Sequence, residues 1–346
     1  MCILRINIKE STMLVLGIES SCDETGLALY SEHDGLIAHL VNSQIDLFTE
    51  YGGVIPEIAA RDHSVKIIEI LKTLLDKTEK NLNDISLIAY TAGPGLIGSL
   101  MVGETVAKTI SEVLKIELLP INHLEGHILT PGLEKDGLKP PYLCLLVSGG
   151  HTQIIRCDDY GDYEIIGETV DDACGEAFDK VGKLLNLEYP GGPKVSKLAE
   201  KGDKNKFSFP RAMMKDKNLN FSFSGLKTAV LYALEDLSEG DYPDVAASFQ
   251  EAVIEVLTTK LSWAVEETGI KKLVCSGGVA SNQLLRDRLK ALAEEQDLQL
   301  SYPSMEFCTD NAAMIAYAGY IRKKLKLKTY QTNFARPRWP LGELYD

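Results

Sequence analysis

Apolar and polar residues follow a pattern that occurs twice along the chain. After twelve residues with a charge every few positions, "MLVLGIESS" and "GLALYSE" are short apolar runs separated by the polar turn "CDET", which is typical of a β-hairpin over residues 13–32. A second hairpin is predicted over residues 141–157, "PYLCLLVSGGHTQIIRC", with two glycines at its turn. Two such hairpins, one near the start and one near the middle of the chain, suggest a duplicated fold.

The elements predicted after each hairpin also match. In the first half, a helical pattern leads to the strand "SLIAYT", the loop "AGPG", a helix over about 97–114 and the strand "IELLP". In the second half, a helical pattern leads to "KLVC", the loop "SGGVAS", a helix over about 282–295 and the strand "LQLSYP". The interval from Gly95 to Gly278 equals the interval from Pro120 to Pro303. The sequence therefore predicts an α/β duplication with two lobes around a central cleft.

The predicted division of the chain follows from this repeat. Residues 1–12 precede the pattern and form an N-terminal extension. Residues 13–138 form the first lobe and residues 139–346 the second, because "LEKDGLKPPY" has the proline and glycine content of a boundary. The second half is longer between its hairpin and the matching later elements, so we expect a helical insertion over about 160–243. A basic tail ends the second lobe.

The composition fits a two-lobed protein without a disulfide framework or a membrane span. The chain has 346 residues, 45% of them hydrophobic, which is enough for two lobes with full cores. Its seven cysteines are scattered and form no C-x-x-C pair, and no apolar run approaches the roughly 18 residues of a membrane span. These features predict a cytoplasmic protein that does not use a membrane.

The net charge of −14 disfavours non-specific binding of nucleic acid by the chain as a whole. An RNA partner therefore requires a local basic surface, and "RKKLKLK" (322–328) followed by "ARPRW" (335–339) is one candidate. The same cations equally fit the solvated end of a helix, where they complement the helix dipole.

The motif "NHLEGH" places His123 and His127 one helical turn apart, where they can share a metal ion. Glu125 points about 200° away on such a helix, so it is badly placed to act as the base of a metallopeptidase. The interval that relates the two halves takes His127 to Asp310 in "FCTDNAAM", at the equivalent place in the second half. Two imidazoles and one carboxylate leave open coordination positions, as in catalytic zinc or non-haem iron sites. We therefore expect these three side chains to bind one ion, and we keep the metallopeptidase as a less favoured alternative.

Glycine-rich and acidic loops also lie at predicted strand ends. "LVSGGHT" and "SGGVASN" have glycines that let a backbone approach a phosphate, and Asn282 stands at a helix start. The turn "CDET" presents Asp23 and Glu24, and "GEAFDKVGK" carries Asp179 where it could bond a ribose. Each feature alone also fits an ordinary turn or a salt-bridged surface. Together they favour a nucleotide, so a small-molecule kinase that uses ATP is a further alternative.

Nine motifs, taken in order, make the chain similar to a known family, the bacterial tRNA N6-adenosine threonylcarbamoyltransferases, TsaD. The motifs are "GIESSCDETG", "AGPGLIGSL", "NHLEGH", "LVSGGHTQ", "EAFDKVGKLL", "YPGGP", "FSFSGLKTA", "CSGGVASN" and "CTDNAAMIA". The resemblance runs from about Met13 to Ala318 and implies a duplicated actin-like ATPase fold, that of the sugar kinase and heat-shock chaperone superfamily. It also makes a non-catalytic paralogue, the third alternative, unattractive, because the acidic and metal motifs are intact.

The resemblance implies a specific reaction. The threonylcarbamoyl group would pass from threonylcarbamoyl-AMP to N6 of adenosine 37, beside the anticodon, in tRNAs reading codons that begin with A. It implies that His123, His127 and Asp310 bind Fe2+ or Zn2+, with Mg2+ accompanying a nucleotide, and that Asp23 with Glu24 forms the catalytic acidic turn. The residues it implies for the substrate phosphate and the nucleotide are Leu146, Val147, Ser148, Gly149, Gly150, Asp179, Gly192 and Asn282. Archaeal and eukaryotic relatives have a tyrosine metal ligand where this chain has Leu146, so the remaining ligand here would be water or substrate.

The resemblance also implies partners. Besides tRNA and threonylcarbamoyl-AMP or ATP, bacterial relatives work with an inactive paralogue, TsaB, and a small P-loop ATPase, TsaE.

Overall fold

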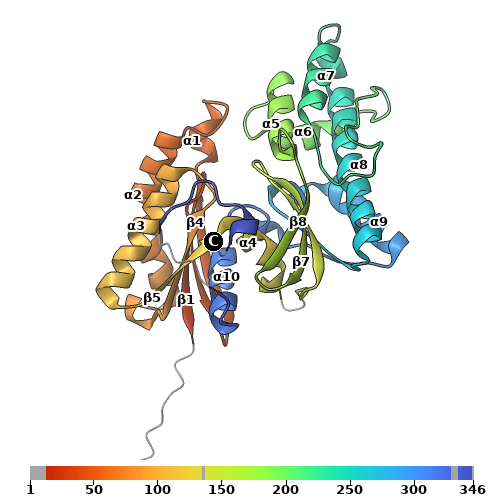
Figure 1. Ribbon diagram of the computed structural model, residues 1–346. Coiled ribbons are helices and arrows are strands. Elements are labelled where there is room, and N and C mark those ends of the chain that lie inside the picture. The colour runs from red at the N-terminus through yellow and green to blue at the C-terminus, as the bar shows by residue number, and fades with distance from the viewer. Residues whose placement is uncertain (1–12, 135–136, 329–333, 345–346) are drawn as a thin grey trace, which may run out of the picture.

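The structure is a computed structural model that describes residues 13–134, 137–328 and 334–344. Each lobe contains a five-stranded sheet (Figure 1). The strands of the first sheet are β1 (Leu14–Glu19), β2 (Glu24–Ser31), β3 (Gly35–Ser43), β4 (Leu87–Gly93) and β5 (Glu117–Asn122). Those of the second are β6 (Tyr142–Val147), β7 (Thr152–Asp159), β8 (Asp162–Glu168), β9 (Lys272–Ser276) and β10 (Gln299–Ser301).

The two sheets have the same topology. Their strand orders are β3-β2-β1-β4-β5 and β10-β9-β6-β7-β8. In each sheet three antiparallel strands come first in the chain, and the next two strands then pair parallel to the first strand and to each other. The predicted α/β duplication is therefore confirmed.

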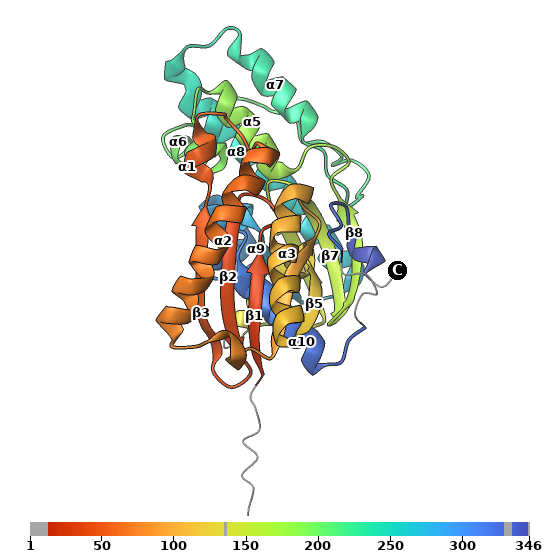
Figure 2. The same cartoon turned by 90° about the vertical axis from the view of Figure 1, so that its left-hand side faces the viewer.

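Helices cover both sheets. The α-helices are α1 (Ile45–Thr49), α2 (Pro56–Thr78), α3 (Ile97–Leu114), α4 (His123–Leu129), α5 (Cys174–Leu184), α6 (Gly191–Ala199), α7 (Ser224–Leu234), α8 (Tyr242–Thr268), α9 (Gln283–Gln296) and α10 (Ala312–Lys324). Short 3-10 helices are η1 (Leu82–Asp84), η2 (Thr130–Leu133), η3 (Glu239–Asp241), η4 (Gly278–Ser281), η5 (Met305–Phe307) and η6 (Leu341–Glu343). Figure 2 shows α2 and α3 in front of the first sheet. In the described part of the chain, every helix is too short or too polar to cross a membrane.

Alternate residues of β1 face opposite sides of the first sheet, as the strand pleat requires. Leu16 and Ile18 belong to one core with side chains of α2, whereas Val15 belongs to another with α10. Gly17 also faces α10, and a Cβ atom at this position would lie 2.4 Å from the backbone oxygen of Ala312. A glycine here therefore lets α10 lie directly on the sheet.

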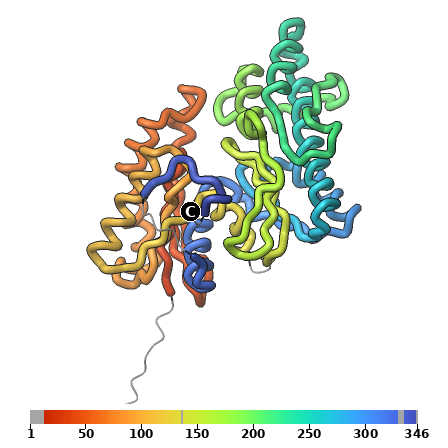
Figure 3. The backbone as a smooth tube through the Cα atoms, viewed as in Figure 1, coloured from red at the N-terminus to blue at the C-terminus, as the bar shows by residue number. Residues whose placement is uncertain are grey.

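The end of the chain returns to the first lobe. α10 packs in the same core as β1 and β4 of the first sheet, and Trp339 packs in the core that contains β1 and α2. Figure 3 shows this last segment of the tube crossing the first lobe. The predicted assignment of 139–346 to the second lobe is therefore wrong for these residues. α10 is buried along nearly its whole length, so its apolar pattern does not show which sheet it covers.

The insertion in the second half also begins differently from the prediction. Residues 162–168 form the strand β8, which pairs with β7, and the helical part starts only at Cys174 of α5. Most β8 side chains are exposed or half-buried, so the strand lacks a clear apolar alternation. The same holds for β3, the matching strand of the first sheet.

Candidate metal centre and cleft

The short helix α4 places the two histidines of "NHLEGH". It begins directly after β5, and Asn122 caps it by accepting hydrogen bonds from the backbone amides of Leu124 (2.9 Å) and Glu125 (3.4 Å). The Asn122 side chain also donates to the backbone oxygen of Trp339 at 2.9 Å. The cap fixes the start of α4 at the carboxyl end of the first sheet.

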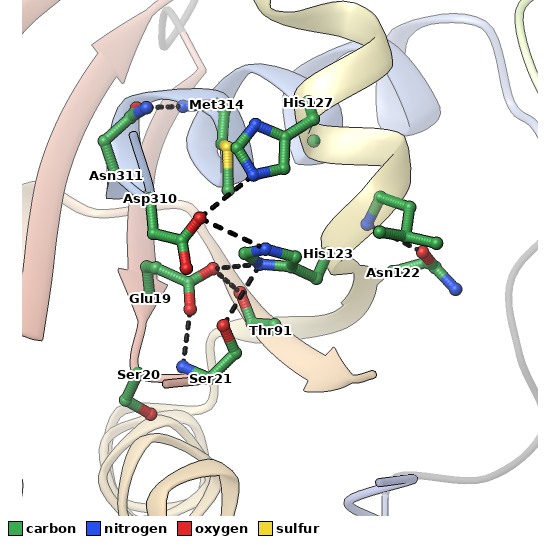
Figure 4. Close-up of polar contacts among 12 residues, drawn as sticks. Glu19, Ser20, Ser21, Thr91, Asn122, His123, His127, Asp310, Asn311 and Met314 are labelled. Atoms are coloured by element: carbon green, nitrogen blue, oxygen red, sulfur yellow. Dashed lines mark hydrogen bonds and ion pairs between the residues drawn. The ribbon is translucent and has the colours of Figure 1, made fainter. Parts of the chain in front are cut away.

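His123, His127 and Asp310 converge, as the interval between the two halves of the sequence predicts. Asp310 Oδ1 lies 3.0 Å from Nε2 of His127 and 3.3 Å from Nε2 of His123 (Figure 4). One ligand atom from each residue lies within 4.8 Å of the others, a spacing that could hold a metal ion. Asp310 stands just before α10, whose first turn is capped by Asn311.

Glu19, which the sequence does not single out, completes this cluster. It ends the fully buried strand β1, and its Oε2 lies 3.0 Å from Nδ1 of His123 and accepts a hydrogen bond from the Thr91 hydroxyl at 2.6 Å. The Ser21 amide donates to the other carboxylate oxygen at 2.5 Å. A carboxylate behind a histidine ligand is the usual way in which proteins orient that imidazole. In the sequence, its only signal is a glutamate at the end of the apolar run 14–18.

The two carboxylates around His123 favour a positive charge between them. Burial by itself would lower the pKa of His123, but attraction to Asp310 and Glu19 outweighs it and raises the pKa well above its usual value. Burial would raise the pKa of Asp310, yet His123 and His127 hold it well below its usual range. Burial would also raise the pKa of Glu19, but attraction to His123 and the hydrogen bond with it lower that pKa. The cluster is electrostatically suited to a cation.

Glu125 points away from this cluster. Its carboxylate is fully buried, accepts from Nε of Arg322 at 2.6 Å and accepts from the Tyr163 hydroxyl at 3.0 Å. The helical spacing predicted that Glu125 would not face the metal ligands, and these contacts agree with it. The carboxylate is a structural group that joins α4 to α10 and β8.

The acidic turn between β1 and β2 carries Asp23, which is buried, and Glu24. Burial raises the pKa of Glu24 well above its usual value, and repulsion from Asp310 and Asp23 raises it further. The turn therefore lies within electrostatic reach of the metal-ligand candidates.

His63 of α2, a fully buried residue that the sequence did not single out, holds this turn at both ends. Its Nε2 lies 2.9 Å from the backbone oxygen of Cys22, and its Nδ1 lies 2.7 Å from the hydroxyl of Thr25. Because a carbonyl can only accept, Nε2 carries the proton and Nδ1 accepts from the threonine. The two bonds bracket the two acidic residues.

The predicted phosphate loop follows β6. Leu146 and Val147 are buried in that strand, and the Ser148 amide donates to the His151 backbone oxygen at 2.8 Å. Gly149 and Gly150 are exposed, with no atom within 4 Å of an added Cβ. The loop therefore leaves backbone accessible to a ligand.

His151 closes this loop and is a third residue, after Glu19 and His63, that the sequence did not single out. Burial lowers its pKa to about 4, and repulsion from His123 and His127 contributes. The ring is therefore neutral at pH 7. It lies close enough to His123 and His127 for their positive charge to disfavour its protonation.

The residues predicted to hold the nucleotide join helices of the second lobe. Asp179 of α5 accepts from the backbone amides of Gly191 (2.8 Å) and Gly192 (3.3 Å) at the start of α6. Asn282 caps α9, and its amide donates to Ser196 of α6 and to Gln250 of α8, both at 2.8 Å. These side chains fix the start of α6 and the start of α9 relative to α5 and α8.

The C-terminal basic segment is less available than the sequence suggested. Arg322 is buried with Glu125, Lys323 pairs with Glu117 at 2.5 Å, and Lys324 donates to Tyr320 at 2.5 Å. Arg336 pairs with Glu343 at 3.2 Å. Residues 329–333 lie outside the described part of the chain. The described contacts favour the interpretation of 322–328 as a helix end.

A duplicated α/β fold with one five-stranded sheet per lobe defines the class of actin-like ATPase folds. HypF from T. kodakarensis superposes with a TM-score of 0.64 at 16% identity, over 91% of this chain and 48% of that one. The Acidaminococcus fermentans (R)-2-hydroxyglutaryl-CoA dehydratase component A superposes with a TM-score of 0.53 at 14% identity, over 90% of this chain and 99% of that one. These likenesses establish the fold alone.

Sequence comparisons identify the family within this class. Residues 35–317 match the TsaD family, described as tRNA N6-adenosine threonylcarbamoyltransferase. Proteins of that name from Methylobacillus flagellatus and Ralstonia pickettii are each 50% identical, over 96% of this chain and 99% of their own length. The chain belongs to the TsaD family of tRNA-modifying transferases, and the kinase and metallopeptidase alternatives are not favoured.

Proposed function

We propose that the cleft transfers the threonylcarbamoyl group of threonylcarbamoyl-AMP to N6 of adenosine 37 in tRNAs that read codons beginning with A. The observation that carries this proposal is the convergence of His123, His127 and Asp310 in a cleft that also presents the acidic turn and an open glycine loop. Family membership supplies the class of reaction.

His123, His127 and Asp310 would hold one divalent ion, Fe2+ or Zn2+. Two properties of the cluster support this fit. Glu19 orients His123 from behind, as carboxylates do for metal-bound imidazoles, and the carboxylates of Glu19 and Asp310 supply negative charge on both sides of its ring. When bound, the ion would supply Lewis acidity to a carbonyl or carboxylate of the threonylcarbamoyl group.

The protein groups around that position have separate tasks. The backbone of Ser148, Gly149 and Gly150, with Leu146 and Val147 behind it, would bind the phosphate of the AMP leaving group. Asp179, Gly192 and Asn282 would hold the nucleoside end from the second lobe, and Mg2+ would accompany a bound ATP.

Asp23 would orient the adenosine amine or accept its proton, with Glu24 beside it. Such a group contributes about 10²- to 10⁴-fold to a rate.

The proposed setting is the cytoplasm, where tRNA and the nucleotide occur together. TsaB and TsaE are the protein partners that the family resemblance implies.

The test is transfer of radiolabelled threonine. Purified protein, threonylcarbamoyl-AMP and the expected partners are combined with wild-type tRNA or with a tRNA whose adenosine 37 is replaced. Label on the wild-type tRNA alone supports the proposal. Absence of label on both, with metal bound and partners verified, contradicts it and returns attention to small phosphate acceptors and a kinase activity.

A further inference from the structure

A tRNA must approach a chain whose net charge is −14, so its contact surface has to be locally basic. The C-terminal cations are largely engaged within the protein. Another stretch is far more basic: residues 180–227 contain eleven Lys and Arg but only four Asp and Glu, a net charge of +7. The rest of the chain therefore carries −21. These residues include the end of α5, all of α6 and the start of α7, within the insertion of the second lobe.

About half of these cations are neutralised by carboxylates of neighbouring elements. The pairs are Lys180 with Asp172 and Glu176, Lys204 with Glu251, Lys206 with Asp241 and Asp244, Arg211 with Glu255, and Lys217 with Glu266. Most of the acidic partners lie on or beside α8, so these cations mainly attach the insertion to that helix. The segment of α6 and the turn after it is different, because Lys197 and Lys201 have no ion pair with any described residue.

Two lysines lie on α6 and a third follows its end. At about 100° per residue, Lys194 and Lys197 lie roughly 60° apart on the helix, away from the buried residues Val195 and Ala199, and Lys201 stands in the turn two residues after the helix. Lys197 and Lys201 are exposed. Lys194 pairs with Glu188 at 2.7 Å, but the Glu188 side chain is 75% exposed, and such surface pairs contribute little. We call these three lysines the α6 basic face; Glu200 borders it on one side.

The start of α6 lies close to the contact between the two lobes. The loop before α6 touches the first lobe, where the Thr49 hydroxyl at the end of α1 donates to the Tyr189 backbone oxygen at 3.4 Å. The helix then starts at Gly191, held by Asp179. Figure 1 shows α1 in the first lobe and α6 in the second, both in the upper part of the view. The nine residues of α6 span about 13 Å from that end.

We propose that the α6 basic face binds backbone phosphates of the tRNA and holds the anticodon region over the cleft. The inference rests on the proposed function, which supplies the polyanionic substrate. Flexible lysines on an exposed helix suit sequence-independent contact with phosphates, because a point charge on a long stem needs no fixed partner geometry. The face has three cations, and the helix that carries two of them starts at Gly191, which Asp179 holds.

The test compares two triple variants of the full chain with its partner proteins present. Lys194→Gln/Lys197→Gln/Lys201→Gln removes the face. Lys72→Gln/Lys77→Gln/Lys80→Gln removes the same charge from exposed positions at the far end of α2 and is the matched control. A third variant with arginine at 194, 197 and 201 keeps the charge. For each, the Kd for tRNA is measured by fluorescence anisotropy at several salt concentrations, together with kcat and KM for transfer.

The proposal predicts a rise of about 10- to 100-fold in the Kd and KM for tRNA when the face is removed, with kcat at saturating tRNA unchanged. The slope of log K against log salt should fall by about 2 to 3, the contribution of three phosphate contacts. The control and the arginine variant should match the wild type.

Equal Kd and equal salt slope in the two glutamine variants would overturn the proposal. Loss of binding to a partner protein with an unchanged Kd for tRNA would overturn it in favour of a protein contact. If the wild type binds tRNA through the face but transfers no label, the face is supported and the proposed reaction fails, so the two failures are distinguishable.

Discussion

Replacing Glu125 tests the central structural argument against the peptidase interpretation. In a metallopeptidase the glutamate of such a motif would be the general base, and its amide variant would fold normally without activity. In this structure Glu125 is fully buried and accepts hydrogen bonds from Arg322 and Tyr163. Glu125→Gln keeps an oxygen that can accept from the tyrosine but removes the charge that compensates Arg322, whose side chain is 1% exposed.

The expected cost follows from that burial. Removing one partner of a buried ion pair leaves an uncompensated charge and costs about 3–5 kcal/mol. We expect the lower end, about 3 kcal/mol, because the amide retains hydrogen bonding. A change of this size lowers Tm by roughly 5–10 °C in a large chain. Glu117→Gln, which breaks the exposed pair with Lys323, is the control and should cost about 0–1 kcal/mol.

The assay is urea unfolding of both variants, with metal content and transfer measured well below Tm. We expect Glu125→Gln to be destabilised but to retain metal and most of its transfer activity. The double variant Glu125→Leu/Arg322→Met should regain much of the lost stability, because an apolar pair of similar volume removes both charges. A variant as stable as the wild type that binds metal but has no activity would refute the reasoning and restore a catalytic role for Glu125.

Three further predictions follow from the described contacts. His127→Ala should remove bound metal and transfer while the protein stays folded, whereas His33→Ala, on the surface, should change neither; stoichiometric metal in the first variant contradicts the assignment. His63→Leu should lower kcat on the order of 10²-fold, because it removes both hydrogen bonds that hold the acidic turn. His63→Gln should retain most of the wild-type kcat, because its amide can both donate and accept. The metal content should be unchanged in both variants. Equal kcat in these two variants would exclude a positioning role. Burial would raise the pKa of Asp171, but hydrogen bonds from Ser222 and from the amide of Phe223 lower it. The ionised Asp171 carboxylate therefore contributes its full stabilisation above the usual aspartate pKa. This stabilisation is lost as the pH falls through the lower pKa that Asp171 has in the folded protein. Asp171→Asn should make the free energy of unfolding less dependent on pH over this acidic range, as an acid-unfolding curve would measure.

Most of the fold could be predicted from the repeat in the sequence. A single interval related the loops of the two halves and paired His127 with Asp310, because duplicated elements place equivalent positions at equivalent strand ends. That interval could not reveal Glu19 or His63. Their partners His123 and Thr25 are distant in sequence, and only the packed sheet and α2 bring them together.

The missed strands and the misplaced helix have physical reasons as well. β3 and β8 are half-exposed sheet edges, so their side chains need not alternate between apolar and polar. α10 is apolar on nearly every side, which predicts a buried helix but not the sheet on which it lies. The basic C-terminal segment was ambiguous because the sequence does not show that Arg322 faces inward to Glu125.

The position of α10 has a consequence for synthesis of the protein on the ribosome. Domains near the N-terminus usually fold first as they emerge. Here the second sheet has all its strands once residue 301 is made, whereas Val15 and Ala89 of the first sheet remain uncovered until residues 312–324 follow. A nascent chain that ends at residue 300 therefore exposes an apolar face of the first sheet, and this face stays exposed during most of translation. The lobe that begins the chain is the last to be completed, and such a chain is a natural client for chaperones.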